Sequence, residues 1–525
     1  MSVTTTQVIA GRDVAEELAA LAAHRPDRLY AVAGGRRVTV ADLDAAVDRV
    51  CEVLADAGIG QDARVAVALP NTVEHVATVF ALLRRGALWV PLNPRLKGAP
   101  LAHLLRDSGA THLVAQDGAD VVGAVAAVWQ EEHGAGLDDG AVLAVDDASP
   151  VAAEAGGAGG RPGTVTRLQR LPGAPGGAVP GTSLLLYTSG TTGPPKGVRV
   201  SQSMLRAAAV GALEVTRARA GDVLYVWEPI FHVGGAQTLL MPLYEDVSLA
   251  LARRFSASGF WADVVATGAT HVHYLGGILQ ILLQRPASEL ERRHRVRVAW
   301  GAGATPAIGE EARRRFGFAV HECYGMTETS SIVTVNPDGP DQGVGRPLPW
   351  FEVRAGDGAG GPGEILVRAA VPGLLTPGYL GNPEASAAAR DGDWFRTGDT
   401  GLLDADGNLH FHGRASDSVR VRGENVSAWQ VEDVYGRHPD VDRCAVVGVA
   451  ADVGEQEMLL LVVLRDGART DLRSVVSWGA DQLAPFQVPR YVRALDGLPL
   501  TPSQRVAKHE LPRGLDGAVD CAAGG

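Results

Sequence analysis

The sequence contains few of the residues that build cross-linked or metal-centred proteins. Only four of its 525 residues are cysteines. Cys51, Cys323, Cys444 and Cys521 lie far apart and lack the spacing of zinc ligands, which is typical of reduced thiols rather than of a disulfide framework. We therefore expect neither a structural zinc site nor disulfide bonds.

Positive charge and long apolar runs are also scarce. The 48 Lys and Arg residues are outnumbered by 60 Asp and Glu residues, and the resulting net charge of -12 would repel a nucleic-acid backbone. No apolar run approaches the length of a bilayer span, and Met1 to Asp13 lacks a basic patch followed by an apolar core. We expect a soluble cytoplasmic protein, a monomer or homodimer, with neither nucleic acid nor membrane as a partner.

Apolar residues make up 46% of the chain, which is enough for large buried cores. Predicted strands alternate with predicted helices, as in Arg64 to Leu69 followed by Val73 to Arg85, so the pattern favours an α/β fold with parallel sheets covered by helices. The character changes near Gly413, which predicts a large domain over residues 1–413 and a small α+β domain over residues 414–525. Residues 150–181 are rich in Gly, Ala and Pro and are expected to form a flexible linker loop.

One segment stands out chemically. Tyr187 to Val198 reads Tyr-Thr-Ser-Gly-Thr-Thr-Gly-Pro-Pro-Lys-Gly-Val between two apolar strands. Glycines allow backbone N–H groups to approach phosphate oxygens closely, hydroxyl groups donate hydrogen bonds, and a lysine supplies positive charge. The residues with these roles are Thr188, Ser189, Gly190, Thr191, Thr192, Gly193 and Lys196. They predict a loop that holds a triphosphate, with a surface loop of chance composition as the alternative.

The spacing differs from that of a P-loop, because two prolines precede Lys196 and a glycine follows it. The motif instead resembles the phosphate loop of the acyl-adenylate-forming superfamily, which includes acyl-CoA ligases, luciferases and the adenylation domains of peptide synthetases. The resemblance extends over roughly Leu18 to Leu511 and is closest to ligases of small acids of the crotonobetaine/carnitine kind. It implies two sheet subdomains and a β-barrel-like part in the large domain, a small mobile C-terminal domain, and ATP, Mg²⁺ and coenzyme A as cofactors.

Three further motifs resemble nucleotide-binding segments of this superfamily. Tyr324-Gly325-Met326-Thr327-Glu328 places a tyrosine on adenine, a threonine at the α-phosphate and a carboxylate on Mg²⁺, which needs few protein ligands. A turn beside a helix cap is the alternative for this segment. The resemblance also assigns the ribose to Asp399 and Arg414, and the adenine face to Gly301, Ala302 and Gly303. A β-turn at Asp399 and tight packing at the glycines are the corresponding structural alternatives.

A fourth motif, Pro229 to Gly235, resembles the segment that closes the acyl pocket and places His232 near the substrate carboxylate. A packed structural histidine is the alternative. Adenylation domains for amino acids carry an aspartate at this position, so His232 argues against an amino acid substrate. The residues expected to shape the pocket are Val233, Gln237, Tyr274, Gly276, Gly277, Met326 and Ser330.

The C-terminal segment Leu498 to Lys508 departs from the superfamily pattern. Arg505 stands where these enzymes carry the lysine that bridges the carboxylate and the α-phosphate, and Lys508 follows three residues later. Arginine keeps the charge but not the geometry of an ammonium group. Either residue is a candidate for the bridging cation.

The activity implied by the resemblance is ATP-dependent activation of a carboxylic acid as acyl-AMP, with transfer to coenzyme A. Gly423, in Val421-Arg-Gly-Glu-Asn-Val426, matches the glycine that lines the pantetheine tunnel. Two alternatives stay open: activation of nitrite to diazotise an aryl amine, as in similar actinobacterial ligases of secondary metabolism, and a catalytically weakened nucleotide-binding pseudoenzyme.

Overall fold

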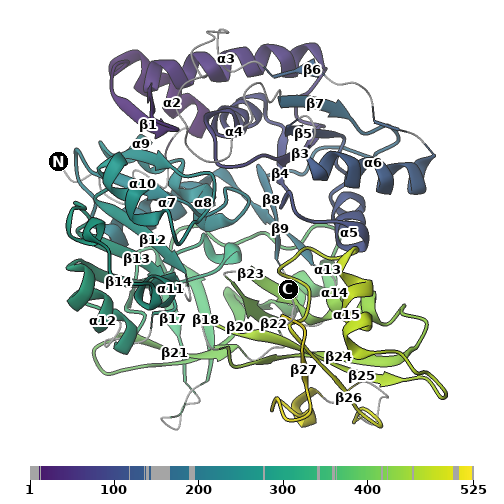
Figure 1. The fold of residues 1–525 in the computed structure, drawn as a ribbon. Coiled ribbons are helices and arrows are strands. Elements are labelled where there is room, and N and C mark those ends of the chain that lie inside the picture. Colours follow the sequence, from purple (N-terminus) through teal and green to yellow (C-terminus); the bar gives the residue numbers. More distant parts are fainter. Residues whose placement is uncertain are drawn as a thin grey trace.

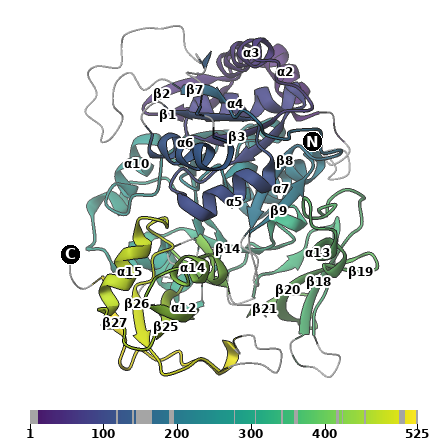
Figure 2. The same ribbon diagram turned by 90° about the vertical axis from the view of Figure 1, so that its right-hand side faces the viewer.

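A computed structural model describes residues 11, 13–116, 119–134, 136–137, 141–143, 166–188, 195–275, 278–304, 306–339, 343–356, 361, 363–414, 418–422, 424–451, 455–499, 506 and 508–522. Two large sheets and a smaller antiparallel sheet occupy the first 414 residues, and the remaining strands form a hairpin and a four-stranded sheet. Figures 1 and 2 show the last hundred residues as a separate lobe at the carboxyl-terminal end of the colour scale. No helix among the described residues has the length and hydropathy that a membrane crossing requires.

The first large sheet has the strand order β6-β7-β5-β3-β4-β8-β9. Its strands are β3 (Arg64–Ala68), β4 (Leu88–Pro91), β5 (His112–Gln116), β6 (Ala141–Val142), β7 (Thr166–Arg170), β8 (Leu184–Thr188) and β9 (Lys196–Val200). Helices α4 (Val73–Arg85), α5 (Gly98–Ser108) and α6 (Asp120–His133) connect and cover them. Strand β3 pairs in parallel with β4 and β5, as expected for strands joined through helices.

The second large sheet has the order β16-β15-β14-β13-β12-β10-β11-β1-β2. Its strands are β1 (Leu29–Ala33), β2 (Arg36–Thr39), β10 (Val223–Val226), β11 (Ser248–Leu251), β12 (His271–Leu275), β13 (Val298–Ala302), β14 (Ala319–Tyr324), β15 (Thr334–Asn336) and β16 (Arg346–Pro347). Its helices are α2 (Val14–His24), α3 (Val40–Asp56), α7 (Gln202–Thr216), α8 (Val233–Thr238), α9 (Met241–Tyr244), α10 (Phe260–Thr267), α11 (Ile278–Gln284) and α12 (Pro306–Phe316).

The alternation of side chains along the strands explains how the two sheets stack. Val65 and Val67 of β3 enter the central hydrophobic cluster with helices α4 and α7, whereas Ala66 and Ala68 face the cluster beneath α5 and α6. Nearly every residue of α4 is buried, as expected for a helix that lies between two sheets. The second sheet likewise has a separate outer cluster beneath α10, α11 and α12.

The remaining elements form a smaller sheet and the small domain. The five-stranded antiparallel sheet contains β17 (Phe351–Arg354), β18 (Gly363–Ala369), β19 (Arg390–Asp391), β20 (Trp394–Leu403) and β21 (Leu409–Arg414), with helix α13 (Pro383–Ala388) nearby. The small domain contains β22 (Ser418–Val421), β23 (Glu424–Ser427), α14 (Ala428–Tyr435), β24 (Val441–Val449), β25 (Glu457–Leu464), α15 (Leu472–Ala480), β26 (Tyr491–Ala494) and β27 (Val519–Asp520). Its own core lies between α14, α15 and the four-stranded sheet.

One expectation from the sequence needs correction, and one structural alternative is excluded. Residues 166–170, expected as linker, form strand β7, which pairs with β5 along its whole length and buries Leu168. The Thr-Gly-Asp segment that ends at Asp399 lies within the ten-residue strand β20 rather than in a turn. Gly398 has a φ of 71°, and the register of β20 against β18 shifts near this point, so the local irregularity is a bulge.

The packing of the small domain depends on a glycine. A Cβ added to Gly479 of α15 would lie 2.5 Å from ring atoms of Tyr435, which is fully buried on α14. We expect Gly479→Ala to destabilise the small domain by about 1–3 kcal/mol, because a filled core has no room for the methyl group. Thermal unfolding followed by circular dichroism would measure the shift.

The matched control is Gly123→Ala in the interior of α6, where a Cβ would have no atom within 4 Å. That substitution should stabilise the helix by about 0.5–1 kcal/mol, because alanine loses less backbone entropy than glycine on folding. Equal effects of the two substitutions would contradict the steric argument.

Candidate functional site

The predicted site residues follow the carboxyl ends of strands in both large sheets. Thr188 ends β8, His232 follows β10, Gly303 follows β13 and Tyr324 ends β14. In open α/β sheets, ligands bind beyond the carboxyl ends of the parallel strands. The topology therefore brings together motifs that are more than a hundred residues apart in the sequence.

Tyr324 and Asp399 lie in direct contact. The Tyr324 hydroxyl donates a hydrogen bond of 2.8 Å to Asp399 Oδ2, and both residues are buried. Asp399 of β20 pairs in register with Arg414 of β21, which places the backbone of Arg414 beside it. The proposed adenine and ribose residues thus form one unit that joins β14 to the smaller sheet.

Glu328 lies where the predicted phosphate loop begins. Its buried carboxylate accepts hydrogen bonds from the Thr188 hydroxyl at 3.4 Å and from the Tyr379 hydroxyl at 3.2 Å. Lys196 Nζ lies 5.0 Å from the centre of the Tyr379 ring, and Thr188 pairs with Lys196 across the β8–β9 hairpin. A carboxylate, a lysine and hydroxyl groups therefore converge at this hairpin, which is the donor set that suits Mg²⁺ and phosphate oxygens.

The glycines of the predicted adenine face require close packing. A Cβ at Gly301 would overlap the carbonyl oxygen of Tyr274 on the neighbouring strand β12. The backbone N–H groups of Gly303 and Ala304 donate to the carboxylate of Glu322 at 3.2 and 2.7 Å, and the Tyr274 hydroxyl donates to Glu322 Oε1 at 2.5 Å. Burial raises the pKa of Glu322 to about 7 in spite of these donors.

His232 contacts the small domain. Its Nε2 lies 2.7 Å from Oε2 of Glu424, the first residue of β23. Arg95, after β4, lies 3.7 Å from the other oxygen of the same carboxylate, and its guanidinium carbon lies 5.3 Å from the centre of the Phe486 ring. The hairpin β22–β23 therefore brings a carboxylate from the small domain to the predicted reaction centre. Figure 1 shows the two strands of this hairpin near the middle of the view.

The two partners change each other's pKa. Burial alone would lower the pKa of His232, but 36% of its side chain is exposed, and the attraction of Glu424 raises the pKa above its usual value. Burial alone would raise the pKa of Glu424, and His232 together with Arg95 and Arg420 lowers it instead. Each group thus stabilises the charged form of the other.

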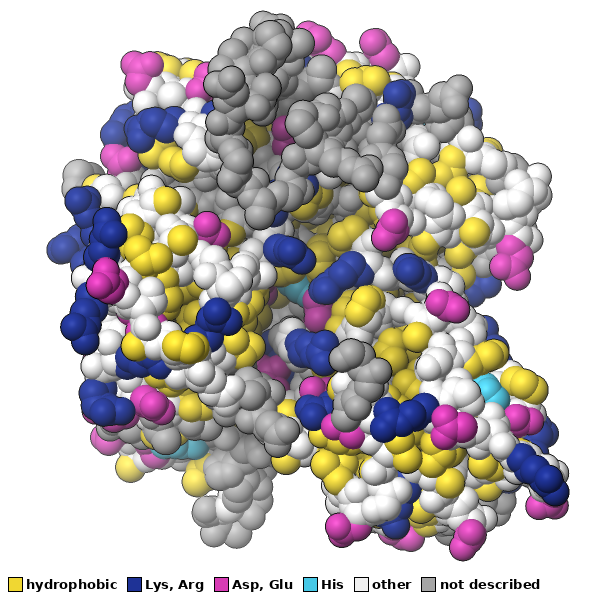
Figure 3. Space-filling view, in the orientation of Figure 1, with side chains coloured by type: hydrophobic (Ala, Val, Ile, Leu, Met, Phe, Trp, Pro, Cys, Tyr) yellow, Lys and Arg dark blue, Asp and Glu magenta, His cyan; other side chains and the backbone are white. Residues whose placement is uncertain are grey.

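Positive side chains border the junction of the two domains. Figure 3 shows a hollow between the lower right lobe and the rest of the molecule, with Lys and Arg side chains along its rim. Arg95 and Arg422 have side chains that are 54% and 66% exposed. Such a rim would attract an anionic ligand toward the site.

Several predicted residues lie outside the part of the chain that the structure describes: Ser189, Gly190, Thr191, Thr192, Gly193, Gly276, Gly277, Gly423 and Arg505. Lys508 is described, and its Nζ lies 2.8 Å from Oε1 of Glu432 on α14. The same oxygen accepts the N–H of Val446, so Lys508 is held within the small domain in this arrangement. The roles of Arg505 and Lys508 stay predictions.

Three residues expected to shape the acyl pocket contact other groups of the protein. Tyr274 is fully buried in the cluster beneath α10 to α12, and its hydroxyl faces Glu322. The Ser330 hydroxyl donates to the carbonyl of Leu374 at 2.6 Å. Met326 is half-buried, and its backbone N–H donates to Thr329. Val233 and Gln237 lie on α8, and Thr327 lies half-buried beside Glu328.

The structure also adds residues that the motifs did not indicate. Tyr379 lies between Lys196 and Glu328, Glu322 holds the loop after β13, and Glu424 reaches His232. Glu322 could have been found from the sequence, because it is a charged residue within an apolar strand and lies two residues before Tyr324. No pattern in the sequence indicated the contact of Glu424, because it depends on how the two domains pack.

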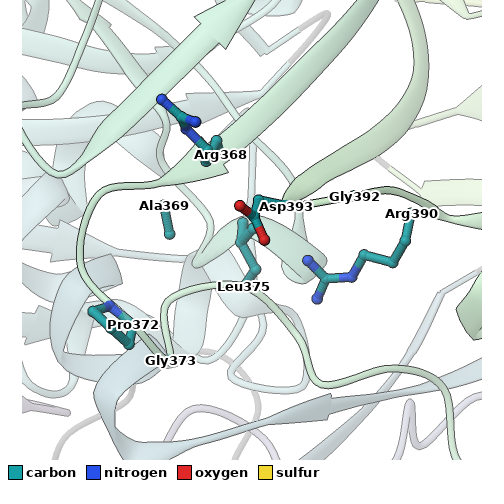
Figure 4. A pocket seen from close by; sticks show the side chains of 8 residues that line it. All are labelled: Arg368, Ala369, Pro372, Gly373, Leu375, Arg390, Gly392 and Asp393. Atoms are coloured by element: carbon teal, nitrogen blue, oxygen red, sulfur yellow. The ribbon is translucent and has the colours of Figure 1, made fainter.

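A cavity of about 440 Å³ lies outside this site, on the smaller sheet. Figure 4 shows Arg368 and Arg390 on opposite sides of Asp393. Arg368 pairs with Glu352, and Arg390 donates to the carbonyl of Thr376, so both cations already have partners. This cavity contains none of the predicted site residues.

Comparison with known proteins agrees with the geometry. The sequence pattern of AMP-binding enzymes matches residues 18–380, and that of the AMP-binding enzyme C-terminal domain matches residues 430–505. The chain belongs to the AMP-binding enzyme family. This AMP-binding enzyme is 32% identical to an oxalate–CoA ligase of Arabidopsis thaliana, over 92% of this chain and 95% of the relative. It is 28% identical to a crotonobetaine/carnitine–CoA ligase of Escherichia coli, over 95% and 98% of the two chains.

Two solved structures resemble the AMP-binding enzyme equally. One is an o-succinylbenzoate-CoA synthetase of Bacillus subtilis bound to a product analogue, OSB-NCoA, with 25% identity, a TM-score of 0.77, and coverage of 94% of this chain and 98% of that chain. The other is the amide bond synthetase McbA of Marinactinospora thermotolerans, with 27% identity, a TM-score of 0.77, and coverage of 95% and 99%. The Bacillus enzyme in complex with AMP, at 25% identity and with coverage of 95% and 98%, gives a TM-score of 0.62.

The residues of the AMP-binding enzyme fit the ligands of its family. Adenylate-forming CoA ligases use ATP, Mg²⁺ and coenzyme A. The residues predicted to bind anion and metal, Glu328, Thr188 and Lys196, lie together at the β8–β9 hairpin. Among the described residues, no group of three or more His, Cys, Asp or Glu side chains is arranged to hold a metal ion. Mg²⁺ held by Glu328 together with phosphate oxygens stays a prediction.

The ion pair between His232 and Glu424 gives a testable pH dependence. Because the pKa of His232 is raised and that of Glu424 is lowered, the ion pair is complete between about 4.3 and about 6.5, the usual values of the two groups. It weakens as pH rises through the raised pKa of His232 or falls through the lowered pKa of Glu424. We expect Glu424→Gln to lower the pKa of His232 to its usual value or below, measured by NMR titration of the histidine ring.

Glu455→Gln provides the control, because Glu455 pairs with Arg420 of β22, the strand beside β23, and does not contact His232. That variant should leave the pKa of His232 raised. A pKa that is the same in Glu424→Gln as in the wild type would show that the two side chains do not meet in solution.

Proposed function

We propose that this AMP-binding enzyme is an AMP-forming acyl-CoA ligase. It activates a carboxylic acid as the acyl adenylate with release of pyrophosphate, and then transfers the acyl group to the thiol of coenzyme A. The observation that carries the proposal is the contact between Glu424 and His232, because it joins the small domain to the segment predicted to close the acyl pocket. The chain has a higher TM-score with the OSB-NCoA complex of the Bacillus subtilis synthetase than with the AMP complex of that synthetase. This difference supports a domain arrangement suited to the thiol-transfer step.

In the first half-reaction, a carboxylate oxygen of the acid attacks the α-phosphorus of ATP and pyrophosphate leaves. Lys196 and the hydroxyl of Thr188 lie where they would stabilise the charge that develops on the phosphate oxygens, and Glu328 would hold Mg²⁺ there. Tyr324 and Asp399 would fix the nucleoside, so that the attack takes place within a bound complex.

In the second half-reaction, the thiol sulfur attacks the acyl carbon, AMP leaves, and the thiol proton is released. The basic rim at the domain junction, with Arg95 and Arg422 exposed, suits the negative charge of coenzyme A. Gly423 directly precedes Glu424 in the sequence, so the contact of Glu424 with His232 supports the predicted contact of this segment with pantetheine.

The test is pyrophosphate release from ATP and Mg²⁺ with a panel of aliphatic, aryl and cinnamic acids, each with coenzyme A, an aryl amine or neither. We expect acid-dependent release, and AMP plus a thioester when coenzyme A is present. An amide in place of the thioester would assign the acceptor to the amine, as the likeness to an amide bond synthetase suggests.

A nitrite arm separates the remaining candidates. Release of pyrophosphate with nitrite and an aryl amine, and with no carboxylic acid, would point to diazotisation. ATP binding without turnover in every arm would point to the pseudoenzyme. None of the relatives described above is named for either activity.

The bridging cation can be assigned by two substitutions. Lys508 would have to leave Glu432 to reach the nucleotide site, so we expect Arg505 to carry the charge. Arg505→Ala should lower acid-dependent pyrophosphate release by about 10²–10³-fold, as loss of a group that stabilises transition-state charge does. Lys508→Ala should change the rate far less.

Arg505→Lys is the matched variant, because it keeps the charge and changes the shape of the donor group. An enzyme adapted to arginine should gain little or lose turnover in this variant. Loss of pyrophosphate release in Lys508→Ala, with Arg505→Ala still active, would assign the bridge to Lys508 instead.

A further inference from the structure

Among the buried polar side-chain atoms of the large domain that have no hydrogen-bond partner within the described part of the chain, three lie in or beside the segments predicted to form the acyl pocket. They are Oε2 of Glu228, Oε1 of Gln237 and Nδ1 of His273. The residues are 5%, 2% and 5% exposed. Buried polar groups are nearly always paired in folded proteins, so atoms left unpaired in a binding pocket point to a ligand.

The Glu228 carboxylate is held between helix α8 and strand β12. A Cβ at Gly234 would overlap this carboxylate, so the absence of a side chain at Gly234 gives Glu228 its space in the segment that closes the pocket. Glu228 Oε2 lies 3.0 Å from His273 Nδ1, without the alignment of a hydrogen bond. Gln237 lies three residues after Gly234 and hence on the same face of α8.

The backbone and the rings around this group are fixed. Asn71 donates to the carbonyl of Glu228 at 2.8 Å and accepts the N–H of Ile230 at 3.1 Å. The His273 ring lies between Trp227 and Trp300, with ring centres 5.9 and 4.4 Å away. These contacts leave the carboxylate little freedom to turn toward another protein group.

The electrostatic surroundings favour a bound hydrogen-bond donor. Burial raises the pKa of Glu228 to about 7, and burial lowers that of His273 to about 3, so the imidazole stays neutral. The charged groups that face Glu228 are His232, Arg420 and Glu424. A donor brought by the substrate would hydrogen-bond to the charged form of Glu228 and offset its desolvation.

We propose that Glu228, Gln237 and His273 form a polar subsite of the acyl pocket that binds an amino or hydroxyl substituent on the substrate acid, away from the carboxylate that is activated. The proposal rests on the acyl-CoA ligase function and narrows its substrate class. An apolar substituent would leave the acceptor oxygens of Glu228 and Gln237 unpaired, and an anionic substituent would meet a carboxylate. An amino substituent can donate to both oxygens, and a hydroxyl substituent can donate to one of them.

The wild-type enzyme supplies the first test. Matched acids are compared as adenylation substrates: 4-aminocinnamate and 4-hydroxycinnamate against 4-methylcinnamate, and 6-aminohexanoate against heptanoate. One of the two series, cinnamic or aliphatic, will be the better substrate. Within that series we expect kcat/KM for pyrophosphate release to be about 10- to 100-fold higher for the acid with a hydrogen-bond donor, which is the range for a hydrogen bond to a charged group.

Two substitutions locate the preference. Glu228→Leu, which fills a similar volume without an acceptor, should remove the preference or reverse it in favour of the methyl compound. Glu228→Gln removes the charge but keeps a hydrogen-bond acceptor. It should therefore reduce the preference for the amino-substituted acid more than the preference for the hydroxyl-substituted acid. Glu291→Gln is the control: this buried carboxylate pairs with Arg315 of α12 rather than with a residue of the proposed subsite, and its loss should leave the ratio unchanged.

The outcomes separate the two levels of the proposal. Thioester formation with equal kcat/KM for donor-bearing and methyl acids, or an undiminished preference in Glu228→Leu, would overturn the subsite while the ligase function stands. Absence of pyrophosphate release and thioester with every acid would overturn the ligase function and the subsite together.

Discussion

The close approach of strands β12 and β13 at Gly301 determines where the site lies. With no side chain at Gly301, the chain passes against the carbonyl of Tyr274, and the following loop then binds Glu322 through two backbone N–H groups. Glu322 belongs to β14, which ends at Tyr324. The predicted adenine face and the aromatic residue opposite it are therefore placed by one three-strand unit whose hydrogen bonds are buried and costly to rearrange.

The rest of the predicted site comes from the smaller sheet and the small domain. Polar contacts, rather than a shared hydrophobic core, join these parts to the strands β12 to β14. Tyr324 reaches Asp399 of the smaller sheet, and His232 reaches Glu424 of the small domain. The small domain has its own hydrophobic cluster, distinct from that of the large domain. A few polar contacts between separately packed bodies suit a domain that changes its position between two half-reactions.

The sequence predicted well those elements whose own side chains determine them. Helix α4 has the predicted bounds, because a run of apolar residues between the cap residue Thr72 and Gly86 leaves little choice. The strand β7 was missed, because Thr-Arg-Leu-Gln-Arg carries one buried apolar residue and is held mainly by pairing with β5. The β-turn that was the structural alternative at Asp399 does not form, because local Thr-Gly preferences give way to the ladder with β18 and β21. Contacts between domains, such as Glu424 with His232, depend on packing that no local pattern encodes.

Strands β1 and β2 belong to the second large sheet, although they precede all strands of the first. Ala31 of β1 pairs with Leu249 of β11 and has only β2 as its other neighbour. During translation at roughly 5–20 residues per second, this hairpin would wait on the order of ten seconds or more for its partner strand to be made. The apolar face of β1 is therefore exposed longest in the growing chain, and a ribosome-bound chaperone would find its first binding site there.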